Sequence, residues 1–195
     1  MVRTVLRTDK LTKRFGALTA VDGIDLEVRE GEVFGFLGPN GAGKTTTLRL
    51  LCALIAPTSG GAEVAGYRLG RDDQQIRATV GILTEQPGLY ERLSAWDNLV
   101  FYATLYGLEP ATARAQAQRF LRLMGLWERR DESVATFSRG MKQKMAIARA
   151  ALHEPRILFL DEPTTGLDPD AAKTVREFIV ALRGEGRTEI GRAHV

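Results

Sequence analysis

A glycine-rich stretch carries the clearest chemical pattern in this sequence. Residues 38–45 read Gly-Pro-Asn-Gly-Ala-Gly-Lys-Thr, which matches the phosphate-loop pattern G-x-x-x-x-G-K-[ST]. Glycines let the backbone wrap closely around phosphates, so that successive N–H groups point toward the anion. A helix that begins directly after such a loop adds the positive end of its dipole. The pattern therefore predicts a site for the phosphates of a nucleotide.

Two side chains at the end of this loop have separate expected tasks. Lys44 would reach the β- and γ-phosphates, and the Thr45 hydroxyl would bind Mg²⁺. The alternative is a glycine turn that matches the pattern by chance, but an apolar run before it and a helical run after it argue against that. The residues that we expect to contact the nucleotide here are Gly38, Pro39, Asn40, Gly41, Ala42, Gly43, Lys44, Thr45 and Thr46.

A second pattern is an apolar run that ends in two acids. Residues 157–162 read Ile-Leu-Phe-Leu-Asp-Glu. Ligands bind at the C-terminal edge of a parallel sheet, so we expect Asp161 to hold Mg²⁺, directly or through water. Glu162 would accept a proton from the attacking water. An acidic helix cap or turn is the alternative, and the phosphate loop upstream favours hydrolysis over it.

Hydrophobic periodicity predicts the elements that position these residues. Alternation over 21–28 predicts a half-buried strand, and apolar runs over 33–37, 80–83 and 157–160 predict buried strands. Predicted helices span about 44–55, 99–106, 110–124, 139–152 and 171–183, the second after a capping-box spacing at 94–97. We therefore expect an α/β fold whose core, about 1–86 and 155–188, carries an inserted helical subdomain over about 87–154.

Composition limits the class of protein. The chain has 195 residues, 44% apolar and 26% charged, which fits one globular domain. A formal charge of +3 with scattered basic residues gives no footprint for nucleic acid. The single cysteine, Cys52, lies in an apolar helical run and is predicted to be buried. Without a spanning run or a leader pattern, we expect a cytoplasmic chain that needs a separate membrane partner to work at a membrane.

Taken together, these motifs resemble the nucleotide-binding domain of the ABC ATPase family, from about Leu6 to Thr188. Residues 138–143 resemble the signature of that family, Ser-Gly-Gly-Gln in its consensus, although Arg139 replaces the first glycine and Met141 follows the second. The resemblance implies a P-loop NTPase with a mostly parallel core sheet, an N-terminal antiparallel β portion, and ATP and Mg²⁺ as ligands. It also implies a signature that acts on ATP held by a partner subunit, here Ser138, Arg139, Gly140, Met141, Lys142 and Gln143.

Three further family positions are filled. Gln86 matches the glutamine loop, whose amide touches Mg²⁺ and the attacking water; a turn residue before Pro87 is the alternative. Phe15 matches the aromatic residue that stacks on adenine, and a half-packed phenylalanine is the alternative. The D-loop, which crosses the dimer interface, matches Gly166, Leu167 and Asp168, where Asp168 could also be a plain helix cap before Pro169.

The resemblance implies an ATP-driven homodimer or heterodimer that moves a permease on a separate chain, at the inner face of the cell membrane. The Met-Lys-Gln signature and residues 83–90 look most like exporters. A soluble ABC ATPase, an unrelated P-loop kinase and a non-catalytic ATP-binding module are the alternatives. In the family, the region that matches the aromatic run Trp96 to Tyr106 forms part of the groove for the permease, but we expect most of these rings to be core.

The end of the sequence departs from the family pattern. After Thr188 the resemblance implies an apolar strand that ends in a histidine at the γ-phosphate, and by spacing His194 falls at that position. Residues 189–195 instead read Glu-Ile-Gly-Arg-Ala-His-Val, with charges and a glycine where a buried strand is expected.

The same stretch matches the translation of the sequencing-adapter codons GAG ATC GGA AGA GCA CAC GTC, with the stop codon TGA next. We therefore expect residues 189–195 to be an artefactual tail on a C-terminally truncated chain. Such a chain would lack a core strand and be weakly active or inactive. A divergent natural terminus is the alternative.

Overall fold

The contacts within the chain divide it into two compact units. Unit 1 comprises Met1–Ile82, Pro155–Asp161 and Gly186–Val195, and unit 2 comprises Leu83–Glu154 and Glu162–Glu185. The computed structural model describes residues 3–36, 38–39, 41–84, 88–184 and 188–192. Within these residues, no helix has both the length and the apolar character that crossing a membrane requires.

An antiparallel sheet forms one part of unit 1, as predicted. Its strand order is β2-β1-β5-β6, with β3 paired to β1. The single strand expected over 21–28 is wrong, because β2 ends at Ile24 and β3 begins at Glu27. Two hydrogen bonds account for the break: the Lys10 N–H donates to Asp25 Oδ1 at 2.7 Å, and the Leu26 N–H donates to Thr8 Oγ1 at 2.7 Å. The strands are β1 (Thr4–Phe15), β2 (Leu18–Ile24), β3 (Glu27–Arg29), β5 (Ser59–Val64) and β6 (Tyr67–Arg68).

A second sheet of unit 1 has the order β4-β9-β8-β7, and β9 runs parallel to both β4 and β8. Its strands are β4 (Val33–Phe36), β7 (Val80–Leu83), β8 (Ile157–Asp161) and β9 (Thr188–Arg192), and the helices of unit 1 are α1 (Lys44–Leu51) and α2 (Asp73–Thr79). The parallel core is therefore confirmed. Helix α1 ends four residues before the predicted end at residue 55, because Ala53 has a left-handed φ of 52° that cannot continue a right-handed helix.

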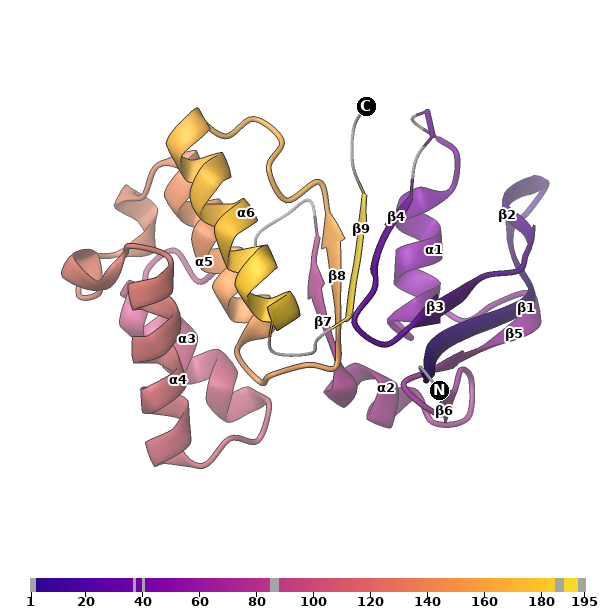
Figure 1. Ribbon diagram of the computed structural model, residues 1–195, viewed down its shortest axis with the longest axis horizontal. Helices are drawn as coiled ribbons and strands as arrows, with labels where there is room; N and C mark the ends of the chain where they lie inside the picture. The colour runs from indigo at the N-terminus through magenta and orange to yellow at the C-terminus, as the bar shows by residue number, and fades with distance from the viewer. Residues whose placement is uncertain (1–2, 37, 40, 85–87, 185–187, 193–195) are drawn as a thin grey trace. The chain divides into compact units, whose positions relative to one another are not determined.

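Strand β9 corrects the expectation that the chain lacks a core strand after Thr188. Figure 1 shows β9 between β4 and β8, where Ile190 is paired with Phe34 on one side and Phe159 on the other. A ladder needs only backbone donors and acceptors, and Ile190 adds an apolar side chain to the core while Thr188 is buried at the start of the strand. Residues 193–195, and with them His194, lie outside the described part of the chain. The origin of the tail stays a prediction.

The core of unit 1 lies between α1 and the strands around it. Leu11, Leu48, Val64 and Phe159 are among its fully buried members. Cys52 is also buried, as predicted, and burial raises the pKa of its thiol because the thiolate would lose hydration. This core fixes the start of α1 and the end of β8, the two positions from which the predicted phosphate and metal residues project.

Unit 2 is helical, with α5 and α6 side by side in Figure 1. The predicted capping box is confirmed, since the Asp97 N–H donates to Ser94 Oγ at 2.9 Å. Residues 162–185 belong to this unit instead of the core in which we expected them, because α6 packs on α5 and Phe178 meets Phe120 at 5.8 Å between ring centroids. The helices are α3 (Ala95–Leu105), α4 (Pro110–Leu123), α5 (Arg139–Ala151) and α6 (Pro169–Gly184), with short 3₁₀ turns at Trp127–Arg129 and Val134–Thr136.

Candidate functional site

The glycine loop reaches α1 through a backbone shape that only glycine fits. Gly43 has a φ of 81°, and a Cβ atom built on it would lie 2.1 Å from the carbonyl oxygen of Ala20. As the N-cap of α1, Gly43 offers no side-chain acceptor, so no capping side chain occupies the N–H groups of the first turn. These donors and the helix dipole suit an anion. Asn40 lies outside the described residues.

The Lys44 side chain folds back over the loop. It is only 6% exposed, and its Nζ donates to the carbonyl oxygens of Gly38 and, at 2.6 Å, of Pro39. The loop thus holds the ammonium group in place at its centre. Ala42 closes the loop with a backbone hydrogen bond to Pro39 of 3.2 Å, and Thr46 is half-buried in the first turn of α1. A lysine held this way is ready to exchange carbonyl partners for phosphate oxygens.

Thr45 and Asp161 meet within unit 1 although 116 residues separate them. The Thr45 hydroxyl donates to Asp161 Oδ2 at 3.1 Å, and Asp161 is 6% exposed at the end of β8. A hydroxyl beside a carboxylate is a hard oxygen pair of the kind that Mg²⁺ uses together with phosphate oxygens. The two residues predicted from separate motifs therefore form one candidate metal position. Among the described residues, no group of three or more His, Cys, Asp or Glu side chains offers another.

Glu162 follows Asp161 directly and belongs to unit 2. It is half-buried, and its backbone has a φ of 50°, which is uncommon for a residue with a side chain. Such conformations persist only where the surroundings hold them, and they occur often at functional sites. Gln86, the third predicted catalytic residue, lies outside the described residues.

The signature residues form the start of α5. Ser138 is its N-cap, and the Met141 N–H donates to Ser138 Oγ at 3.3 Å. Gly140 is buried, whereas Arg139 is exposed. Lys142 forms an ion pair of 2.6 Å with Glu91. The predicted helix start is therefore confirmed, and the serine hydroxyl lies at its exposed end.

The D-loop residues lead into α6. Gly166 has a φ of 69°, which explains a glycine at this position, and Leu167 is half-buried. Asp168 caps α6 by accepting the Ala171 N–H at 2.9 Å, which is the alternative that the sequence left open beside the D-loop role. That hydrogen bond stabilises the carboxylate and lowers the pKa of Asp168.

Phe15 ends β1 with its ring 50% exposed. Lys13 Nζ lies 5.0 Å from the ring centroid, a cation–π arrangement at the surface. The side chain is therefore not a core residue, and its ring has the exposure that stacking on a base requires.

The aromatic residues of α3 are less buried than we expected. Phe101 is 42% and Tyr106 39% exposed, and Trp96 and Tyr102 are half-buried. The expectation that most of these rings are core is wrong, because Ala95, Leu99 and Ala103 take the inward face of α3 instead. The rings of Tyr90, Phe101 and Tyr102 meet within 5.1–5.8 Å between centroids and form an exposed aromatic cluster.

Sequence patterns missed one link in unit 2. Arg149 donates to the Gly88 carbonyl at 3.2 Å, and its guanidinium lies 5.0 Å from the centroid of the Tyr102 ring. Tyr102 donates to the same carbonyl at 2.5 Å. The contact joins residues 61 positions apart, so no local spacing could predict it.

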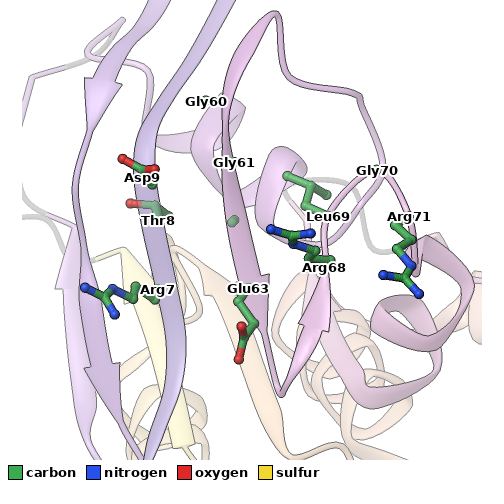
Figure 2. A pocket seen from close by; sticks show the side chains of 11 residues that line it. Arg7, Thr8, Asp9, Gly60, Gly61, Glu63, Arg68, Leu69, Gly70 and Arg71 are labelled. Atoms are coloured by element: carbon green, nitrogen blue, oxygen red, sulfur yellow. The ribbon is translucent and has the colours of Figure 1, made fainter.

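A pocket on the antiparallel sheet contains none of the predicted site residues (Figure 2). Figure 2 shows Glu63 between Arg7 and Arg68, which agrees with the pairing of Arg7 with Glu63 and of Glu63 with Arg68. Alternating charges across paired strands stabilise a sheet surface. The arrangement is explained by strand pairing and adds no group to the phosphate site. The lining residues are Arg7, Thr8, Asp9, Gly60, Gly61, Ala62, Glu63, Arg68, Leu69, Gly70 and Arg71.

Comparison with known proteins finds a matching family and several similar ATP-binding proteins. A family described as "ABC transporter" matches residues 21–165. The bacitracin transport ATP-binding protein BcrA of Bacillus licheniformis is 42% identical over 93% of this chain, and the linearmycin resistance ATP-binding protein LnrL of Bacillus subtilis is 37% identical over 97%. The chain spans 58% and 61% of the lengths of these two relatives.

The fold is also similar to that of solved structures. One is a dimeric ATP-binding cassette, MJ0796, in a post-hydrolysis state with ADP and Pi. It is 25% identical, covers 97% of this chain and 88% of its own, and superimposes with a TM-score of 0.87.

Proposed function

Because this chain belongs to the ABC transporter family of ATP-binding proteins, we propose that it binds and hydrolyses ATP as the motor subunit of a membrane transporter. The observation that carries this proposal is the meeting of two motifs: Thr45, at the end of the glycine loop, donates to Asp161, at the end of β8, at 3.1 Å. Phosphate-binding and metal-binding groups then share one edge of the sheet, where nucleotides bind in such folds.

The chemistry divides among the residues as follows. The loop N–H groups and Lys44 neutralise the phosphates, which stabilises the charge that builds up during phosphoryl transfer. Thr45, Asp161 and Gln86 would hold Mg²⁺, which would supply positive charge to polarise the phosphate groups. Glu162 accepts the proton of the attacking water. Phe15 stacks on the adenine ring.

Two subunits, identical or different, would close head to tail around two ATP molecules. Each would place its signature, from Ser138 to Gln143, on the γ-phosphate held by the other, with the D-loop from Gly166 to Asp168 crossing the interface. The dimer with ADP and Pi formed by a similar cassette supports this arrangement. Ser138 is exposed at the N-terminus of α5, which suits a contact in trans.

The partner that would use this closure is a permease on a separate chain, with this subunit at the cytoplasmic face of the membrane. The aromatic cluster of Tyr90, Phe101 and Tyr102 supports a docking surface on unit 2, because exposed aromatic groups are typical anchors at protein interfaces. The exporter-like signature and the bacitracin transport and linearmycin resistance relatives favour an exporter of a drug-like compound.

Two variants test the catalytic assignment. Lys44→Ala should remove most nucleotide binding. Glu162→Gln should retain binding but lower turnover to a small residual rate and trap a closed dimer, because it keeps the shape of the side chain and removes the base. ATP binding by equilibrium titration and phosphate release measure the two tasks separately. Normal turnover by Glu162→Gln would contradict the assignment.

A mixing experiment tests assembly. Neither Lys44→Ala nor Ser138→Arg subunits should hydrolyse ATP alone, whereas their mixed dimer retains one complete site. Recovery of part of the native rate is the expected result, and full activity of a strict monomer would contradict it. A soluble ABC ATPase would behave the same way here, so co-expression with the permease decides between the two: only a transporter subunit should co-purify with it in the membrane.

A further inference from the structure

The start of α5 holds the segment that follows Glu162 in the same chain. Gln143 Nε2 donates to the carbonyl oxygen of Pro163 at 3.2 Å in a partly buried contact. Both residues belong to unit 2. Gln143 is the last residue of the signature, and Pro163 is the residue immediately after the proposed general base. The contact therefore joins two motifs that the sequence separates by 20 positions.

Glu162 needs such support, because its backbone is strained. Its φ of 50° lies in the left-handed region, where a Cβ atom crowds the neighbouring carbonyl. The chain then turns sharply, since the Thr165 N–H donates to the Glu162 carbonyl at 3.2 Å. A strained residue keeps its conformation only where neighbouring groups fix it. The amide of Gln143 holds the carbonyl of the residue that follows Glu162.

The far end of the same segment also rests on α5. A Cβ atom built on Gly166 would lie 2.7 Å from the guanidinium carbon of Arg139, so the guanidinium lies directly on the glycine. A Cβ atom built on Gly140 would lie 3.3 Å from both Asp168 Oδ2 and the Ala171 side chain. The first turn of α5 is thus packed on the D-loop, and the segment between Glu162 and α6 is held at both ends.

We propose that Gln143 is a positioning residue for the ATP site of its own subunit: by holding Pro163, it keeps the Glu162 carboxylate where it can take the proton. The proposal rests on the proposed function, in which Glu162 is the base and Ser138 acts on the ATP of the partner. Because Ser138 and Gln143 share one helix, α5 then joins the two ATP sites of the dimer. The competing role for Gln143 is a direct contact with the ATP of the partner.

A double-mutant cycle in the full protein with its permease separates the two roles. Gln143→Glu keeps the side-chain shape and removes the donor to Pro163. It should lower kcat about ten-fold while KM for ATP and ATP-driven dimerisation change by less than about two-fold. In a Glu162→Gln background it should have no further effect on the residual rate, since residues that act as a unit are not additive.

Gln74→Glu, an exposed position on α2, carries the same charge change and should leave turnover unchanged. Weaker ATP-driven dimerisation by Gln143→Glu, or a loss that adds to that of Glu162→Gln, would overturn the proposal in favour of contact with the ATP of the partner. If the native protein itself neither dimerises with ATP nor hydrolyses it, the proposed function fails instead, so the two failures are distinguishable.

Discussion

Two helix starts in this molecule have parallel tasks but opposite construction. Helix α1 follows a glycine, has no side-chain cap, and begins with a buried lysine held by loop carbonyls. Helix α5 follows Ser138, whose side chain caps it, and begins with the exposed Arg139. The N–H groups at the start of α1 therefore remain available to an anion. The start of α5 already has a side-chain cap and exposes Ser138.

The difference indicates which atoms each site depends on. In unit 1 the backbone would make the proposed phosphate site, so the position of a few peptide groups would decide its function. In unit 2 the proposed contacts come from side chains at the start of α5, a helix that has its own side-chain cap. Substitutions at the first site should therefore disturb folding and binding together, and substitutions at the second should separate stability from activity.

The largest effect should come from adding one methyl group at each helix start. Gly43→Ala places Cβ 2.1 Å from a backbone oxygen at a φ of 81°. Gly140→Ala places Cβ 3.3 Å from the Cβ of Ala171 and from Asp168 Oδ2, and the Asp168 side chain can rotate slightly. We expect Gly43→Ala to lower the free energy of unfolding by at least about 3 kcal/mol and to abolish ATP binding. Gly140→Ala should change it by less than about 1 kcal/mol. Urea unfolding measures both, and equal losses would contradict the comparison.

A cap substitution at α5 should have a smaller effect. Ser138→Ala removes the acceptor of the Met141 N–H and should cost about 1 kcal/mol of stability. Ser138→Asn restores a capping acceptor, so its stability should return to near the native value while its hydrolysis stays low. If Ser138→Asn recovered full turnover, capping alone would explain the serine.

Strand β9 provides a glycine that geometry does not require. A Cβ atom on Gly191 would lie 3.8 Å from the Leu160 carbonyl oxygen, which is ordinary contact, and φ is not left-handed there. Glycine weakens a strand interior, so Gly191→Ala should raise the stability of unit 1 by about 0.5–1 kcal/mol. Thermal unfolding of both variants should show that Gly191→Ala is more stable than the native protein and that Gly43→Ala is less stable. A destabilised Gly191→Ala would indicate that β9 does not pair as described.

The smallest effect concerns pH. The Ala171 N–H lowers the pKa of Asp168 below its ordinary value of 3.8, so the charged form stabilises the folded state. This contribution is fully present above pH 3.8 and is lost as the pH falls through the lower pKa of the folded protein. Asp168→Asn should flatten the decline in stability over that acidic range. An unchanged pH profile in unfolding experiments between pH 2 and 6 would contradict this role of the cap.

Sequence patterns predicted those parts of this protein that depend only on residues close together in the chain. These parts are the glycine loop, the acidic strand end and the helix starts at Ser94 and Ser138, each of which depends on residues within a few positions of one another. The α6 cap at Asp168 is also local, and the sequence left it open as the alternative to the D-loop role. The P-loop fold followed from their order. Where local strain intervened, prediction failed, as at Ala53, which ends α1 early.

Tertiary structure decided everything that depends on distant partners. The sequence by itself determined the phosphate loop and the two acids, but only the fold brought Thr45 to Asp161 and Gln143 to Pro163. It also placed Thr188–Arg192 as a strand between β4 and β8, despite a sequence that does not resemble a buried strand. The physical reason is that the backbone groups of β4 and β8 can pair with an extended segment between them, and an apolar residue such as Ile190 then faces the core. The presence of these two neighbouring strands cannot be read from residues 188–192 alone.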